Sequence, residues 1–212
     1  MIKTAKAPVT PIRQTTQYTC MSTSMCMCLR AYGLDLTEAQ VNKVMGAAPM
    51  QGATWEQALA CAQHFGMQAM LVTPASVPDL KRWTDLGFPV MISWNPEGRP
   101  WSHASVVFDV DGNMVHVADP NIPDPEQTTR VVPAEEFYKK WYEDAGNYLV
   151  RRIALVIMRE VTPDGQQAYP VREQFEALLA SRTMIHTASN RPSSFDISYK
   201  VATRWLTSKG LR

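Results

Sequence analysis

The sequence predicts an α+β fold, with helices early in the chain and strands late. Three observations lead to this prediction. Apolar residues recur at helical spacing before residue 67, whereas alternating or continuous apolar runs typical of strands dominate residues 67–158. The turn Asp111-Gly112-Asn113 joins two such runs as a hairpin. A linker rich in Pro, Gly and Gln follows residue 160, so we expect one folded domain over 1–160 and a helical extension over 161–212.

The predicted helices carry recognisable start and stop signals. The first covers residues 20–32, where apolar side chains recur on one face, and it stops at Gly33. A capping box, Thr54-Trp55-Glu56-Gln57, marks the start of another helix. The five helices expected in the folded domain cover residues 20–32, 37–46, 54–66, 77–86 and 133–143.

Strand patterns fill most of the remaining domain. The expected strands cover residues 67–72, 88–94, 103–110, 114–118 and 149–158. Polar segments over 95–102 and 121–129 are expected to be loops. In the extension, apolar residues at helical spacing over 171–179 and 195–206 predict two further helices. The second of these is amphipathic and basic, so we expect residues 195–206 to dock on a partner or to support a homo-oligomer.

Composition narrows the class of protein. The 212 residues carry a net charge of +1, which argues against nucleic acid or a membrane surface as a general partner. No export signal and no apolar run of membrane-spanning length is found. The four cysteines lack zinc-site spacing, and three of them crowd into one predicted helix, where bridging is geometrically poor. We therefore expect free thiols, a cytoplasmic or other reducing compartment, and neither metal nor organic cofactor.

Three residues combine into a set that suits nucleophilic catalysis. Cys20 opens the first predicted helix, His103 begins a strand, and Asp119 ends the next strand. A thiol needs a nearby imidazole to become a thiolate, and a carboxylate can hold that imidazole in position. Taken singly, each has an ordinary interpretation: a buried thiol, a hydrogen-bonded strand histidine and a strand-ending aspartate.

The motifs around these residues resemble one family. Residues 13–20, Arg-Gln followed by five residues and Cys20, precede a helix that ends Ala-Tyr-Gly, as in the bacteriocin-processing, double-glycine leader cysteine peptidases. The resemblance continues through residues 101–107 and 117–120 and covers about 12–158 in order. It implies a papain-like cysteine peptidase fold, in which N-terminal helices pack on a C-terminal antiparallel sheet.

The resemblance also implies roles. Cys20 would be the nucleophile, His103 the proton acceptor and donor, and Asp119 the group that orients the imidazole. Gln14 would donate its side-chain amide to the oxyanion, together with the Cys20 backbone N–H. Two alternatives remain open from sequence: Gln17 for the oxyanion, and the residue two positions after Asp119, Asn121, for orienting His103.

The function implied is that of a thiol protease, a hydrolase with a Cys-His-Asp catalytic triad. It would cut a peptide or protein substrate through a thioester, and the resemblance implies a cut after small residues such as Gly-Gly. One departure is Met21, which follows Cys20 where the family usually has glycine. Two alternatives differ in class: a catalytically vestigial scaffold that assembles through its C-terminal tail, and a thiol acyltransferase or deamidase that uses the same thioester.

Overall fold

A computed structural model describes residues 8–98, 102–122, 129–144 and 149–159. The helices are α1 (Cys20–Ala31), α2 (Glu38–Met45), α3 (Trp55–His64), α4 (Val77–Asp85) and α5 (Ala134–Lys140). The strands are β1 (Met67–Val72), β2 (Val90–Trp94), β3 (His103–Asp111), β4 (Met114–Ala118), β5 (Thr129–Pro133), β6 (Tyr142–Asp144), β7 (Leu149–Arg151) and β8 (Ala154–Arg159). The predicted extension over 161–212, its two helices included, lies outside the described residues.

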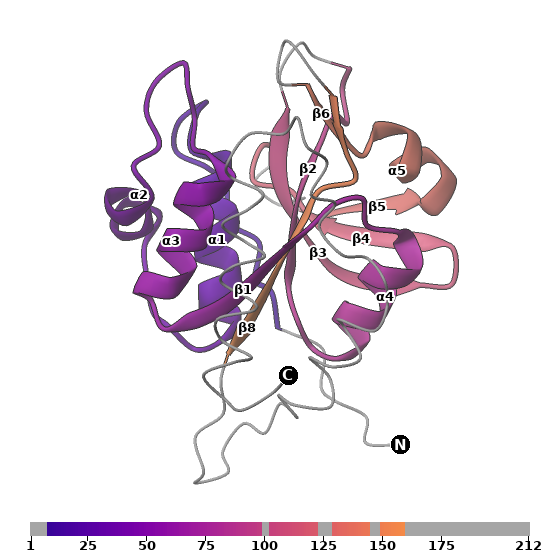
Figure 1. Ribbon diagram of the computed structural model, residues 1–212, viewed down its shortest axis with the longest axis horizontal. Coiled ribbons are helices and arrows are strands. Elements are labelled where there is room, and N and C mark those ends of the chain that lie inside the picture. The colour runs from indigo at the N-terminus through magenta and orange to yellow at the C-terminus, as the bar shows by residue number, and fades with distance from the viewer. Residues whose placement is uncertain (1–7, 99–101, 123–128, 145–148, 160–212) are drawn as a thin grey trace, which may run out of the picture.

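A six-stranded antiparallel sheet divides the domain into two layers of core. Its strand order is β1-β8-β2-β3-β4-β5, and β6 and β7 pair separately. Helices α1, α2 and α3 gather on one side of the sheet, and α4 and α5 on the other (Figure 1). Because side chains alternate along a strand, β3 serves both cores: Val106 packs with the helices α1 to α3, and Val107 packs with α4 and α5. The predicted α+β architecture is confirmed.

Helix α1 is the centre of the helical layer. Ten of its twelve residues are buried, so it is enclosed on nearly every side and not only along the predicted apolar stripe. It packs between the sheet, mainly β3, and the helices α2 and α3. Those two are surface helices, and each begins with a full capping box, built on Thr37 and Gln40 in α2 and on Thr54 and Gln57 in α3. Such caps are typically worth about 1 kcal/mol each, which fixes where the outer helices start.

The strands that carry the candidate site follow the predicted pattern. β3 and β4 form an antiparallel hairpin with the register Val106 to Ala118, interrupted by a bulge between Val107 and Asp109. Its tight turn includes Gly112, whose φ of 55° lies in the left-handed region that glycine adopts readily. β2 pairs with the other edge of β3, with Trp94 opposite His103. The start of β3 and the end of β4 therefore lie at the same end of the sheet.

The sequence prediction is wrong in the segment after residue 128. Residue 129 was assigned to a loop, but β5 (Thr129–Pro133) pairs along the whole of β4. The helix predicted over 133–143 ends at Lys140, and β6 follows it directly. β5 has the β-branched run Thr129, Val131 and Val132, but its exposed and half-buried positions alternate on an edge strand, where the apolar signal is weak.

The strand predicted over 149–158 is also divided into two. Arg152 has a φ of 58°, which breaks the extended chain between β7 and β8. The break is held by Trp141, whose side chain donates to the Ile153 carbonyl at 2.9 Å and whose own carbonyl accepts from the Arg152 N–H at 3.0 Å. A continuous apolar run could not reveal this corner, because its cause is a tryptophan more than ten residues away in sequence.

Within the described residues, none of the helices combines the length and the apolar character required to cross a bilayer.

Candidate active site

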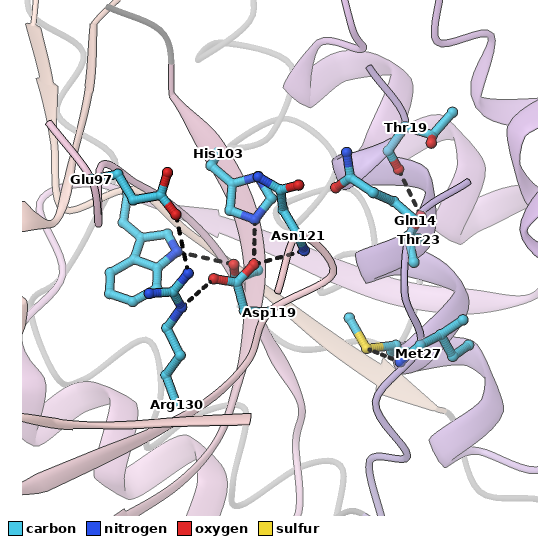
Figure 2. Close-up of polar contacts among 12 residues, drawn as sticks. Gln14, Thr19, Thr23, Met27, Glu97, His103, Asp119, Asn121 and Arg130 are labelled. Carbon is cyan, nitrogen blue, oxygen red and sulfur yellow. Dashed lines mark hydrogen bonds and ion pairs between the residues drawn. The ribbon is translucent and has the colours of Figure 1, made fainter. Parts of the chain in front are cut away.

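His103 and Asp119 meet where β3 begins and β4 ends. The His103 Nε2 lies 2.6 Å from Asp119 Oδ1, and the Asp119 side chain is completely inaccessible to solvent (Figure 2). The histidine side chain is 13% exposed, so its ring is not fully enclosed. Because Nε2 is taken by the carboxylate, Nδ1 is the ring nitrogen left for a second partner.

Cys20 supplies that second partner from the helical side of the sheet. It is the first residue of α1, and its thiol forms a hydrogen bond with His103. The backbone N–H groups of Ala104 and Met21 also donate to the Cys20 sulfur. The sequence-predicted residues Cys20, His103 and Asp119 are therefore placed together as one hydrogen-bonded chain.

This arrangement favours a charged thiolate. Burial raises the pKa of Cys20, but the hydrogen bond and the positive charge of His103 outweigh it and leave that pKa below its ordinary value. Burial lowers the pKa of His103, yet the hydrogen bonds and charges of Asp119 and Cys20 raise it overall, to about 9. Burial likewise opposes ionisation of Asp119, while His103 and its other partners bring the pKa of that carboxyl below its ordinary value. The three shifts together favour the charged forms of these groups, which are a thiolate, an imidazolium and a carboxylate.

The other three cysteines have the opposite environment. Cys26, Cys28 and Cys61 are fully buried among apolar side chains. Burial raises the pKa of all three thiols, that of Cys61 to about 12. They remain protonated core residues, as the sequence predicted, and none of the four cysteines is bridged to another. The described residues also contain no group of three or more His, Cys, Asp or Glu side chains that could hold a metal ion.

Gln14 lies near the hydrogen-bonded residues Cys20, His103 and Asp119. Its backbone N–H donates to the Pro120 carbonyl at 2.9 Å, which ties it to the residue after Asp119. Its side-chain Nε2 donates to the Thr16 carbonyl at 2.6 Å, and its buried Oε1 has no hydrogen-bond partner among the described residues. Figure 2 places this side chain beside the first turn of α1. Gln17, the alternative candidate for the oxyanion donor, is exposed, and none of the contacts described above involves it.

The second open alternative concerned the group that orients His103. The imidazole is bound by Asp119, and the backbone N–H of Asn121 donates to the same Oδ1 at 2.9 Å. Asn121 thus contributes a main-chain donor to the carboxylate, and its side chain is exposed. Met21, the departure noted after Cys20, is 7% exposed and packs in the core around α1.

Arg130 is a site residue that sequence reasoning missed. From β5, its Nε donates to Asp119 Oδ2 at 2.6 Å, and its terminal nitrogen lies 3.3 Å from Glu97 Oε1 (Figure 2). A lone arginine in a polar segment carries no functional signal. The signal that could have found it is indirect: once β5 is recognised as a strand beside β4, its inner residues must face the end of β4.

Comparisons with known proteins place the chain. The model of the peptidase C39-like family matches residues 6–149. No curated protein gives a significant match to the sequence. Solved structures match over most of their own length, and at identities below 25% these likenesses establish the fold.

Three of those structures illustrate the likeness. The peptidase domain of Streptococcus ComA, a bi-functional ABC transporter involved in quorum sensing, has a TM-score of 0.58 at 18% identity, covering 72% of this chain and 99% of its own. A double glycine motif protease from an AMS/PCAT transporter, solved with the leader peptide, has a TM-score of 0.56 at 23% identity, covering 74% and 95%. A C39-like peptidase from Bacillus anthracis has a TM-score of 0.56 at 17% identity, covering 74% and 97%.

The papain-like peptidase fold expected from the sequence is therefore confirmed, with helices α1 to α3 packed on an antiparallel sheet. The resemblance to double-glycine leader peptidases is confirmed as well. Because the family model spans more than half of the sequence, the chain belongs to the peptidase C39-like family.

Proposed function

We propose that this protein is a cysteine peptidase that cleaves a peptide bond through a thioester on Cys20. The observation that carries the proposal is the continuous chain of hydrogen bonds from the Cys20 thiol through His103 to Asp119. Membership of a peptidase-like family supports the same reaction class. Each step of the reaction can be assigned to a group in the described structure.

Acylation begins with the thiolate. Cys20 Sγ attacks the carbonyl carbon of the scissile bond, and the peptide carbonyl oxygen becomes an oxyanion. His103, protonated near neutral pH because its pKa is raised to about 9, gives its proton to the leaving amine. Asp119 stabilises the imidazolium and keeps Nδ1 turned toward the sulfur. The neutral imidazole then removes a proton from water as the water oxygen attacks the thioester, which releases the acid, expels the Cys20 thiolate and restores the imidazolium.

The oxyanion requires donors that are already in place. Gln14 Nε2 has two N–H bonds, of which one is used by the Thr16 carbonyl, so the other is available. The backbone N–H of Cys20 is the second donor in this proposal, at the start of a buried helix whose partial positive charge favours an anion. Preorganised donors of this kind are typically worth about 2.7–4 kcal/mol of barrier each.

The substrate class follows from the structural relatives. A relative solved with its leader peptide is called a double glycine motif protease. By that likeness, we propose that this chain accepts a peptide segment with small residues, such as Gly-Gly, before the cut. The same thioester could pass its acyl group to an amine or arise from a glutamine side chain, and the products distinguish these reactions.

The test is a cleavage assay on the full chain. Peptides with a central Gly-Gly and matched peptides with Leu-Leu are incubated with the protein, and products are identified by mass spectrometry. We expect hydrolysis after Gly-Gly, its complete loss in Cys20→Ala and His103→Ala, and a thioester adduct on Cys20 alone. His64→Ala is the matched control, because His64 is an exposed histidine at the end of α3.

Three outcomes would contradict the proposal. Hydrolysis that survives in Cys20→Ala would exclude the thioester. Transfer to an added amine, or conversion of glutamine to glutamate, would move the protein to the acyltransferase or deamidase class. A folded wild-type protein that neither cleaves peptides nor reacts with a thiol-directed peptide probe would support the vestigial scaffold.

A further inference from the structure

Arg130 reaches the site through strand register. In the pairing of β4 with β5, Arg130 lies opposite Val117, two residues before Asp119. β5 is the edge strand of the sheet, so this position borders the end of β4 without another strand beyond it. A long side chain at this place can extend along the sheet edge to the residue that follows β4.

The two oxygens of Asp119 have different partners. Oδ1 accepts from the Asn121 backbone N–H at 2.9 Å and lies 2.6 Å from His103 Nε2. Oδ2 accepts from Arg130 Nε at 2.6 Å. The carboxylate is completely buried, whereas Arg130 is 30% exposed. Arg130 therefore links a buried carboxylate to a partly exposed part of the surface.

The guanidinium is itself held from a second side. Glu97, in the loop after β2, accepts from a terminal nitrogen of Arg130 at 3.3 Å. The charged groups around Asp119 are thus His103 from β3, Arg130 from β5 and, through them, Cys20 from α1 and Glu97. A planar guanidinium fixed at two points is a rigid support, because its donors have a set geometry.

We propose that Arg130 is a positioning residue of this site: its guanidinium fixes Asp119 Oδ2 so that Oδ1 stays directed at His103. This inference rests on the proposed function and deepens it. The terminal torsion of an aspartate is soft, so one bonded oxygen alone does not fix the plane of the carboxylate. With Oδ2 held by Arg130, the carboxylate plane is set by bonds at both oxygens.

Loss of Arg130 has two opposed electrostatic consequences. Removal of a positive charge alone would strengthen the effect of Asp119 on His103 and raise the histidine pKa. Removal of the support leaves a buried carboxylate oxygen unpaired, so the carboxylate turns toward other donors and its bond to His103 weakens. That second effect lowers the pKa of His103. A positioning role therefore predicts a fall, and a purely electrostatic role predicts a rise.

The experiment compares Arg130→Met, Arg130→Lys and Glu97→Gln with the wild-type chain. We expect Arg130→Met to lower kcat/KM on the Gly-Gly peptide by about 10- to 100-fold, chiefly through kcat, as a small misplacement of a reacting group does. Since the imidazolium exists only below the pKa of His103, the alkaline limb of the pH profile should move to lower pH. Arg130→Lys should recover part of the rate, and Glu97→Gln should show a weaker change in the same direction.

A control and a second readout make the result decisive. Arg30→Met removes an arginine from an exposed pair with Asp35 and should leave the profile unchanged. The titration of His103 is also followed by NMR, which requires no turnover and is read only in variants whose spectra show the native fold. A rise in the His103 pKa in Arg130→Met, or no change, would overturn the positioning role. If wild-type protein lacks peptidase activity, the proposed function fails, while the NMR titration still decides what Arg130 does.

Discussion

The two halves of the candidate site are held in different ways. His103 and Asp119 come from paired strands, and a third strand adds Arg130, so sheet register fixes the proton-transfer half. Cys20 and Gln14 come from a helix start and the segment before it, where side-chain hydrogen bonds replace the ladder of a sheet. The geometry of the sheet half should therefore tolerate the loss of a single side-chain hydroxyl group. The geometry of the nucleophile half depends on a few threonine and amide hydrogen bonds and should be more sensitive.

The largest expected contrast concerns the cysteines. At pH 7, Cys20 should be alkylated by iodoacetamide at least about 1,000-fold faster than Cys61, because the pKa of Cys20 is lowered and a thiol with a pKa near 12 is about 0.001% thiolate at that pH. The lowered pKa of Cys20 should make its rate fall less steeply with decreasing pH than the rate of an ordinary thiol. Mass spectrometry of the labelled native chain gives each rate. Comparable rates for the two thiols would contradict the thiolate–imidazolium pair.

Next in size is the change Asp119→Asn, which breaks the sheet half. An amide presents Nδ2–H or Oδ1 to the imidazole without charge, so the tautomer and the stabilisation of the imidazolium are both lost. We expect kcat/KM to fall by about 1,000- to 10,000-fold, with the fold retained as judged by circular dichroism. Asp109→Asn, on the same hairpin but beyond the bulge, is the matched control. A loss below tenfold at Asp119 would assign the orienting role to another group.

Gln14→Ala breaks the nucleophile half. Removal of an oxyanion donor should lower kcat by about 100- to 1,000-fold with little change in KM, because the donor acts on charge that develops during the reaction. Gln17→Ala, the exposed neighbour, should change kcat by less than about threefold, which is measured by the same steady-state assay. The reverse ranking of the two variants would transfer the oxyanion role to Gln17.

Thr19→Val tests how the nucleophile half is supported. The Thr19 hydroxyl donates to the Thr16 carbonyl at 3.2 Å, the same oxygen that receives Gln14 Nε2 at 2.6 Å. Loss of this hydroxyl should loosen the amide and lower kcat by about tenfold, while Thr19→Ser should restore it. Thr23→Val is the control, because its hydroxyl bonds only to the helix backbone at Thr19. Equal losses in Thr19→Val and Thr23→Val would point to the helix as a whole.

The smallest expected effect is on stability, and it concerns a contact between α3 and β6. Trp55 Nε1 of α3 donates to Glu143 of β6 at 2.8 Å. Burial raises the pKa of Glu143 above its ordinary value, despite this bond and one from Ser93. The folded protein therefore binds that proton more tightly than the unfolded chain, and stability falls as pH rises from the ordinary Glu value through the raised one.

Glu143→Gln should remove this fall in stability with rising pH, because glutamine does not ionise. We expect its free energy of unfolding at pH 7 to exceed that of the wild type by about 1 kcal/mol or less, and the two proteins to converge near pH 4. Urea unfolding at several pH values measures both. Glu136→Gln, which changes an exposed α5 glutamate paired with Lys140, is the control and should alter the free energy of unfolding by about 0.5 kcal/mol or less. A destabilised Glu143→Gln at neutral pH would show that the charge itself supports the contact.

Sequence reasoning located much of this molecule because its signals are local. The predicted helix starts at Thr37 and Thr54 lie one residue before α2 and α3, and the strand β1 has the predicted bounds. Cys20, His103 and Asp119 could be found because each combines reactive chemistry with the boundary of an element. Their proximity depends on long-range contacts. The order of the motifs along the chain predicted this proximity, and the structure places the three side chains together.

What sequence reasoning missed depends on partners far along the chain. Arg130 acquires its place only through the pairing of β5 with β4, and an edge strand has a weak apolar pattern. The end of α5 and the corner at Arg152 are set by the buried Trp141, which bonds across to Ile153. The bond from the Gln14 backbone N–H to the Pro120 carbonyl is likewise a long-range contact, which no local pattern predicts.

The burial of α1 has consequences for amide exchange and for the substitutions that this protein can tolerate. The helix that begins with Cys20 also contributes Met25, Cys28 and Leu29, all fully inaccessible, to the middle of the core. Its amide protons should therefore exchange only through global unfolding, whereas those of the surface helix α2 should exchange through local fraying. Substitutions at these buried apolar positions would alter both stability and the placement of the thiol, so the reactive end of this helix depends on the core residues that follow it.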